Sequence, residues 1–189
     1  MPYSRRAVLC FVWCALFAPL DATVLIPAEF REIVNGSDII ASGRVIDTTP
    51  EWGDNRKRID TRVTLQVGTY LKGGPGETVV FKVPGGEIGR FRNVMVGAPV
   101  FRTGDEVVVF LTRRTSEEPM VFGLNQGVFR ISFDEQTKRR VVVRPAVLAR
   151  GESPEIVVRG SAARRSVPLE TFGAQVQAVL AEGAPRGAR

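Results

Sequence analysis

Residues 59–67 read IDTRVTLQV, and this stretch decides the fold class of the chain. Apolar and polar side chains alternate along it, and a period of two predicts a strand with one buried and one solvated face. The strand is expected to continue to Leu71, where residues 72–76 (KGGPG) supply a turn. A second strand is expected over residues 78–83, so the two form a hairpin.

Further strands are expected on both sides of this hairpin. Residues 39–46 predict a strand that is bent or bulged at Gly43, because a glycine inside a strand often marks such a site. Residues 106–111 form an unbroken apolar run, which is typical of a central strand covered on both faces. Extended structure is also expected over residues 91–96, 121–124, 128–133, 139–143 and 155–158.

One helix is expected at each end of the strand region. Residues 28–35 place Phe30, Ile33 and Val34 on one face, with Pro27 suited to the first helical position. Residues 169–181 carry an apolar stripe at helical spacing, for which core packing is the expected role. The whole pattern predicts a mostly β fold, an OB-like, partly open antiparallel barrel with a short N-terminal helix and a C-terminal helix.

The first 22 residues predict a signal peptide. Arg5 and Arg6 precede an apolar stretch, residues 7–20, that is too short to span a bilayer comfortably. Both cysteines of the chain, Cys10 and Cys14, lie inside it. We therefore expect an exported protein, periplasmic or extracellular, with a cysteine-free mature chain. Twin-arginine export and the general route both stay open.

Four parts are expected along the chain. They are a signal peptide over residues 1–22, an OB-like barrel domain over 23–145, an appended strand and helix over 146–182, and a flexible tail over 183–189. No transmembrane span is expected after cleavage. The formal net charge of +6 favours anionic partners and says nothing about the fold.

The residue inventory restricts the possible chemistry. The chain contains no histidine, and after cleavage it contains no cysteine, so triads with a histidine base and cysteine nucleophiles are excluded. Zinc and copper sites usually need the same residues. The spacing of Asp47, Asp54 and Asp60 matches no calcium loop, and three basic residues lie among them. We expect no enzyme activity, metal or cofactor; the alternative is a hydrolase whose paired carboxylates converge in a cleft.

Three predicted loops, residues 48–58, 84–92 and 125–127, are expected to present a binding site for a protein or glycan partner. Trp52 is the expected anchor, because large aromatic side chains dominate binding energy at interfaces; packing on the barrel rim is its other interpretation. The expected binding residues are Trp52, Gly85, Gly86, Arg90, Arg92, Asn125 and Gln126.

A basic chain can also meet nucleic acid or an anionic envelope surface. Nucleic acid is not expected, because an exported protein seldom meets it and most phenylalanines stand at core-type positions. An envelope-associated structural protein, held by its basic surface, is a further alternative. The oligomeric state stays open.

Several segments together resemble the netrin-like or tissue-inhibitor-of-metalloproteinase barrels, which belong to the OB-fold group. They are residues 30–34 with 37–45, the strand ending in LKG at 63–73, and TGDEVVVFL at 103–111. VPGG at 83–86 and GLNQGVFR at 123–130 resemble a family of uncharacterised exported bacterial proteins. The resemblance covers residues 28–133 and implies an OB-like barrel. The inhibitors of that group place an N-terminal cysteine on the zinc of their target, and no residue of the mature chain matches it.

Overall fold

A computed structural model describes residues 28–53, 56–74, 76–113, 118–145 and 166–183. The predicted signal peptide, the predicted strand at 155–158 and residues 184–189 of the predicted tail lie outside the described residues. The elements in chain order are α2 (Phe30–Gly36), β1 (Ile39–Trp52), β2 (Ile59–Lys72), β3 (Thr78–Pro84), β4 (Gly86–Ile88), β5 (Phe91–Asn93), β6 (Glu106–Thr112), β7 (Met120–Val121), the 3-10 helix η3 (Leu124–Gly127), β8 (Val128–Asp134), β9 (Arg139–Val143), β10 (Val167–Pro168) and α3 (Leu169–Gly183).

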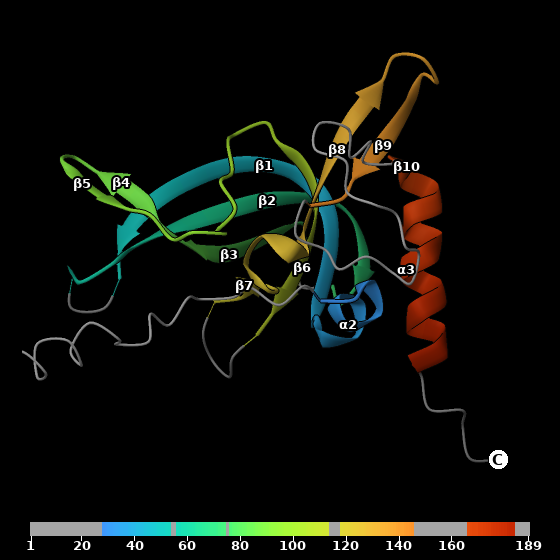
Figure 1. Cartoon of the computed structure of the whole chain (residues 1–189), viewed down its shortest axis with the longest axis horizontal. Helices are drawn as coiled ribbons and strands as arrows, with labels where there is room; N and C mark the ends of the chain where they lie inside the picture. The colour runs from blue at the N-terminus through green and yellow to red at the C-terminus, as the bar shows by residue number, and fades with distance from the viewer. Residues whose placement is uncertain (1–27, 54–55, 75, 114–117, 146–165, 184–189) are drawn as a thin grey trace, which may run out of the picture.

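The main sheet has eight strands in the order β1-β2-β3-β7-β6-β8-β9-β10. Because β1 also pairs with β6, the strands β1, β2, β3, β7 and β6 form a ring. The ring is weakly closed between β3 and β7, because a single parallel residue pair, Lys82 with Met120, joins these two strands. The predicted mostly β fold, with a short helix before the strands and a C-terminal helix, is confirmed, and the eight-stranded sheet is partly ringed without forming a clear barrel (Figure 1).

Strand β1 is long and curved, and it contributes to both sides of the ring (Figure 1). Its pairing with β2 shifts register between Ser42 and Gly43, which confirms the predicted irregularity. A Cβ atom at Gly43 would stand 2.1 Å from the backbone oxygen of Gln66. Glycine at position 43 therefore permits the close approach that bends the strand into the ring.

The predicted loop at residues 48–58 is wrong in its first half. Residues 48–52 belong to β1, and they pair with β2 up to the contact between Trp52 and Ile59. Their polar composition suggested a loop, but a cross-strand partner satisfies the backbone groups of polar and apolar residues alike. Trp52 thus ends a strand and does not lie in the middle of a loop.

Two cores lie on opposite faces of the sheet. The first core fills the ring, and its largest members include Phe81, Leu65 and Leu111. The second lies between the sheet and the two helices, and it includes Phe110, Phe129 and Phe172. Alternate residues of β6 enter the two cores, so the prediction of a central strand covered on both faces is confirmed.

Helix α3 is part of this second core. Phe172 and Val176 are fully buried, and α3 lies beside β9 and β10 with its contacts to α2 closing the layer (Figure 1). The helix runs two residues beyond the predicted end, and α2 begins two residues after its predicted start. The apolar stripe predicted for residues 169–181 therefore serves packing, as expected.

The predicted strand at 121–124 and turn at 125–127 need correction. Strand β7 covers Met120–Val121, and the chain then turns through Gly123 and Leu124, whose φ angles are +54° and +59°. Two successive left-handed residues end an extended strand, and residues 124–127 form the 3-10 helix η3.

Candidate functional site

Most of the predicted loop at residues 84–92 forms a separate hairpin. Strands β4 and β5 pair antiparallel, with Gly86 opposite Asn93 and Ile88 opposite Phe91. Gly89 has a φ of +57° and, with Arg90, makes the two-residue turn. The hairpin lies at the end of the molecule where β1 is joined to β2 (Figure 1).

Gly85 and Gly86 fix this hairpin to β2. The backbone N–H of Gly85 donates to the oxygen of Ile59 at 3.0 Å, and the Thr61 hydroxyl donates to the Gly85 oxygen at 2.7 Å. Both glycines have positive φ angles, and a Cβ at Gly86 would lie 2.8 Å from that hydroxyl. The two glycines thus hold the hairpin in place, and both also line the cavity described below.

Aromatic side chains gather where β1 ends against the hairpin. The rings of Trp52 and Phe91 meet edge to face with 5.4 Å between centroids, and the Arg90 guanidinium lies 5.2 Å from the Phe91 centroid. An open hollow of about 440 Å³ surrounds them, lined also by Arg56, Ile88 and Gly89. Phe91 remains half exposed.

Exposed apolar side chains concentrate on the segment that follows the hairpin. Of the seven large hydrophobic side chains that are exposed in the described chain, five lie within residues 91–100: Phe91, Val94, Met95, Val96 and Val100. Val96 is 91% exposed. We call these five residues together with Trp52 and Arg90 the hairpin surface. A cluster of exposed apolar groups on one segment is typical of an interaction site, whereas single exposed ones are ordinary.

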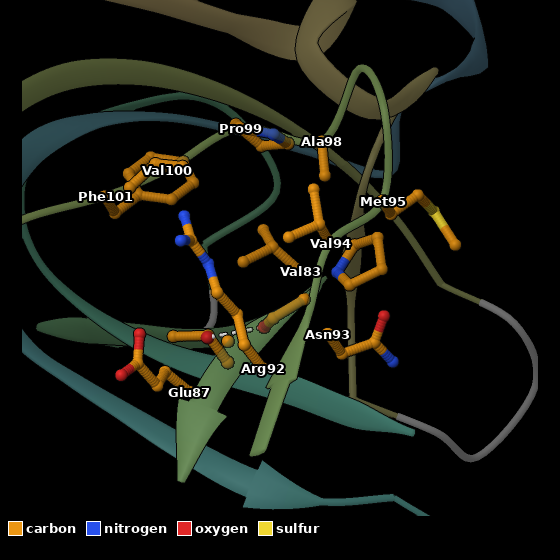
Figure 2. A pocket seen from close by; sticks show the side chains of 14 residues that line it. Val83, Glu87, Arg92, Asn93, Val94, Met95, Ala98, Pro99, Val100 and Phe101 are labelled. Carbon is orange, nitrogen blue, oxygen red and sulfur yellow. Dashed lines mark hydrogen bonds between the residues drawn. The ribbon is translucent and has the colours of Figure 1, made fainter. Parts of the chain in front are cut away.

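A cavity of about 250 Å³, which we call the hairpin cavity, lies between β4–β5 and residues 94–101. Its wall includes Val94, Pro99, Val100 and Phe101. Figure 2 shows the Arg92 side chain extending from the hairpin toward Val100 and Phe101 across the cavity. None of the ion pairs of the described residues includes Arg92.

Arg130 of β8 and Asp105, which directly precedes β6, hold the far wall of the cavity. Arg130 of β8 donates to the Val100 backbone oxygen at 2.6 Å and to the Asp105 carboxylate at 2.7 Å. Asp105 also accepts from the backbone N–H of Arg102. The position of Val100 is therefore set by β8 and not by the loop alone.

A charged cluster lies directly after Asp105. Arg44 and Arg140 donate to the two carboxylate oxygens of Glu106 at 2.7 and 2.6 Å. The hydrogen bond from Arg44, with the charge of Arg140, holds the pKa of Glu106 below its usual value near 4.5. The two ion pairs of Glu106 connect β1, β6 and β9 next to the far wall of the hairpin cavity.

The structure brings five of the seven predicted binding residues to the hairpin: Trp52, Gly85, Gly86, Arg90 and Arg92. Asn125 and Gln126 lie in η3 and line neither hollow. Gln126 is 3% exposed, and its side-chain oxygen accepts a hydrogen bond from the Ala28 backbone N–H at 2.6 Å. The prediction that Gln126 faces a partner is wrong, because this contact buries it. The backbone N–H of Asn125 donates to the backbone oxygen of Gly97, which ties η3 to the middle of the apolar segment.

The sequence prediction missed the apolar segment itself. Residues 91–96 were expected to be extended, but β5 ends at Asn93 and Val94, Met95 and Val96 lie outside any strand. A signal for this was present. Gly97 and Pro99 interrupt the segment, and both residue types disfavour pairing within a sheet. Apolar side chains next to them are therefore not buried by strand pairing.

The described lining of the two hollows contains a single carboxylate, that of Glu87. The paired acids that the hydrolase alternative needs do not converge there. Within the described ranges, no group of three or more acidic, histidine or cysteine side chains is placed to hold a metal ion. The helices that the structure describes also include none that is long and apolar enough to cross a bilayer.

Comparison of the chain with protein-family models, with curated proteins and with solved structures found no match.

Proposed function

We propose that this protein is an exported binding module without catalytic activity, which recognises a protein or glycan partner through the hairpin surface. One observation carries the proposal: of the seven large apolar side chains that are exposed among the described residues, five lie on a single ten-residue segment beside the Trp52–Phe91 pair. Leaving such groups in water is unfavourable, and a partner that covers them gains about 25 cal/mol for each Å² of apolar surface removed from water.

The contacts of Trp52 support a binding surface that is ordered before a partner arrives. Trp52 is held by β1 and by the ring of Phe91, so it loses little freedom when a partner binds. Arg90 adds a cation beside the aromatic pair, and aromatic and arginine side chains are enriched among the residues that dominate binding energy.

Export is the second part of the proposal. It is supported by the basic front and short apolar stretch of residues 1–22. Mass spectrometry of the protein recovered from its native host tests it directly. Recovery of a product that retains Cys10 and Cys14 would refute removal of the leader.

Affinity capture tests the binding function. The chain without residues 1–22 is immobilised and exposed to solubilised envelope extract, in parallel with Trp52→Ala and with Phe133→Ala. Phe133 is a matched control, because it is 56% exposed on β8 and does not contribute to the hairpin surface. A partner retained by the parent chain and by Phe133→Ala, and at least about tenfold less by Trp52→Ala, supports the proposal. Equal retention by all three contradicts it.

A further inference from the structure

The hairpin cavity combines one cation with an aliphatic wall. Arg92 contributes a guanidinium group, and none of the carboxylates in the described chain lies within ion-pair distance of it. Its side chain crosses the cavity toward Val100 and Phe101 (Figure 2). An arginine fork in this position presents parallel N–H donors, and a carboxylate accepts them in a bidentate pair.

The apolar lining and the volume of the cavity indicate the size and the chemical character of the rest of the ligand. Val94 and Val100 are 68% and 70% exposed, and both line it together with Pro99. The volume of about 250 Å³ is below the roughly 300–1,000 Å³ usual for drug-sized ligands. The space therefore suits a short aliphatic group and not a large ring system or an extended polymer.

Both sides of the cavity are fixed before any ligand arrives. Thr61 and Ile59 hold Gly85 on one side, and Arg130 holds Val100 on the other. Fixed walls reduce the ordering that binding would otherwise require.

We infer that the hairpin cavity binds a carboxylate that carries a short aliphatic chain, with Arg92 as the carboxylate partner and Val94, Pro99 and Val100 around the aliphatic group. The inference rests on the proposed function, because it names the chemistry that the hairpin surface recognises in its partner. In a protein partner, this chemistry is a C-terminal aliphatic residue or an acidic side chain beside one.

Removing the charge of Glu87 is expected to change the affinity for the acid in the opposite direction to removing the charge of Arg92. Glu87 lines the same cavity and stands across from Arg92 in the β4–β5 register, and it makes no ion pair with Arg92. Its negative charge repels a bound carboxylate. Glu87→Gln therefore strengthens binding of the acid, whereas Arg92→Gln weakens it by about tenfold or more. Both side chains are exposed, so neither change removes a core contact.

Three small probes test the inference on the chain without residues 1–22. N-acetyl-leucine has a terminal carboxylate, its amide has the same aliphatic group without the charge, and acetyl-Leu-Asp-amide has its carboxylate on the neighbouring side chain. Binding is followed by NMR shifts of the backbone amides at Arg92, Val94 and Val100. Arg139→Gln is the matched control, since it removes one exposed cation on β9, outside the cavity lining.

The inference expects binding of one or both acids, little binding of the amide, loss with Arg92→Gln and no change with Arg139→Gln. Whichever acid binds more tightly identifies the source of the carboxylate. Equal binding of the acids and the amide overturns the role of Arg92, and absence of binding by all probes overturns the cavity as a site. The capture experiment above stays independent, because a partner bound through Trp52 is retained or lost whatever the small probes do.

Discussion

The indole ring of Trp52 and the phenyl ring of Phe91 lie 5.4 Å apart at an interplanar angle of 70°. Thirty-nine positions of sequence separate the end of β1 from the start of β5, and this contact joins the main sheet to the hairpin. The edge-to-face geometry places the positive edge of one ring against the negative face of the other. The pair therefore stabilises the hairpin while half of Phe91 stays exposed.

A double-mutant cycle measures this contact. Trp52→Ala and Phe91→Ala are expected to show an interaction energy of about 0.5–1.5 kcal/mol in the free energy of unfolding, which is usual for such pairs. Chemical denaturation with urea supplies the four free energies. Phe133 gives the control cycle with Trp52, because these rings make no aromatic contact in the described structure. A coupling near zero for both cycles would show that the hairpin does not pack on Trp52.

Gly43→Ala is expected to destabilise the fold by about 2 kcal/mol or more, because its methyl group would overlap the Gln66 backbone oxygen at 2.1 Å. Gly68→Ala is the matched control in the same pair of strands. Its nearest neighbour would be the Ser42 oxygen at 3.7 Å, an ordinary contact, so its stability changes by less than about 1 kcal/mol. Urea midpoints compare the two variants. Equal effects would contradict the close approach of β1 and β2.

Phe172→Ala tests whether α3 belongs to the folded unit. Phe172 is fully buried and lies 4.9 Å from Phe129, centroid to centroid, so truncation removes a shared core contact. We expect a loss of about 3–5 kcal/mol in the free energy of unfolding. Glu170→Ala is the control on the exposed side of the same helix. If Phe172→Ala left thermal unfolding of the sheet unchanged, α3 would be an independent appendage.

Acid stability depends on Glu106. The folded chain holds its pKa below the ordinary value near 4.5, chiefly through the hydrogen bond from Arg44. A lowered pKa stabilises the folded state above the unfolded value, and this contribution disappears as the pH falls through the folded value. Glu106→Gln should thus be less stable than the parent at neutral pH. The difference should shrink below about pH 4.5.

Urea unfolding of the parent and of Glu106→Gln at several pH values measures this difference. The two proteins are compared because they share all other carboxylates, whose effects on stability cancel in the difference. Asp134, for example, also has a lowered pKa through its hydrogen bond from Thr137. Lys138→Gln provides a control that leaves the Glu106 cluster intact, since Lys138 pairs with Glu135 at an exposed turn. A parent-to-variant difference that stays constant from pH 7 to pH 3 would contradict the assignment.

Local pattern was sufficient to predict the strands at residues 59–67 and 106–111, and long-range contacts explain where the prediction failed. The alternation at residues 59–67 and the apolar run at 106–111 carry their own burial signal, and both are confirmed. By contrast, residues 48–52 pair with β2, and the buried Gln126 accepts a hydrogen bond from Ala28, 98 positions earlier in the chain. Neither partner is visible within a local window of sequence.

The candidate site was also predicted only in part from the sequence. Glycine and arginine content drew attention to residues 84–92, and the structure places these residues at the hairpin. The apolar segment 94–100 escaped the prediction, because exposure depends on the absence of a packing partner, and only the three-dimensional arrangement shows it.

Site-specific photo-crosslinking tests the central claim most directly. A benzophenone amino acid replaces Val96 in one version of the chain and Phe133 in another, since both positions are exposed and apolar and only the first belongs to the hairpin surface. After irradiation in the native host, adducts are separated by mass. The proposed function predicts a discrete adduct from position 96 that is lost when Trp52 is also changed to alanine. The same adducts from position 133, or none from position 96, would contradict it.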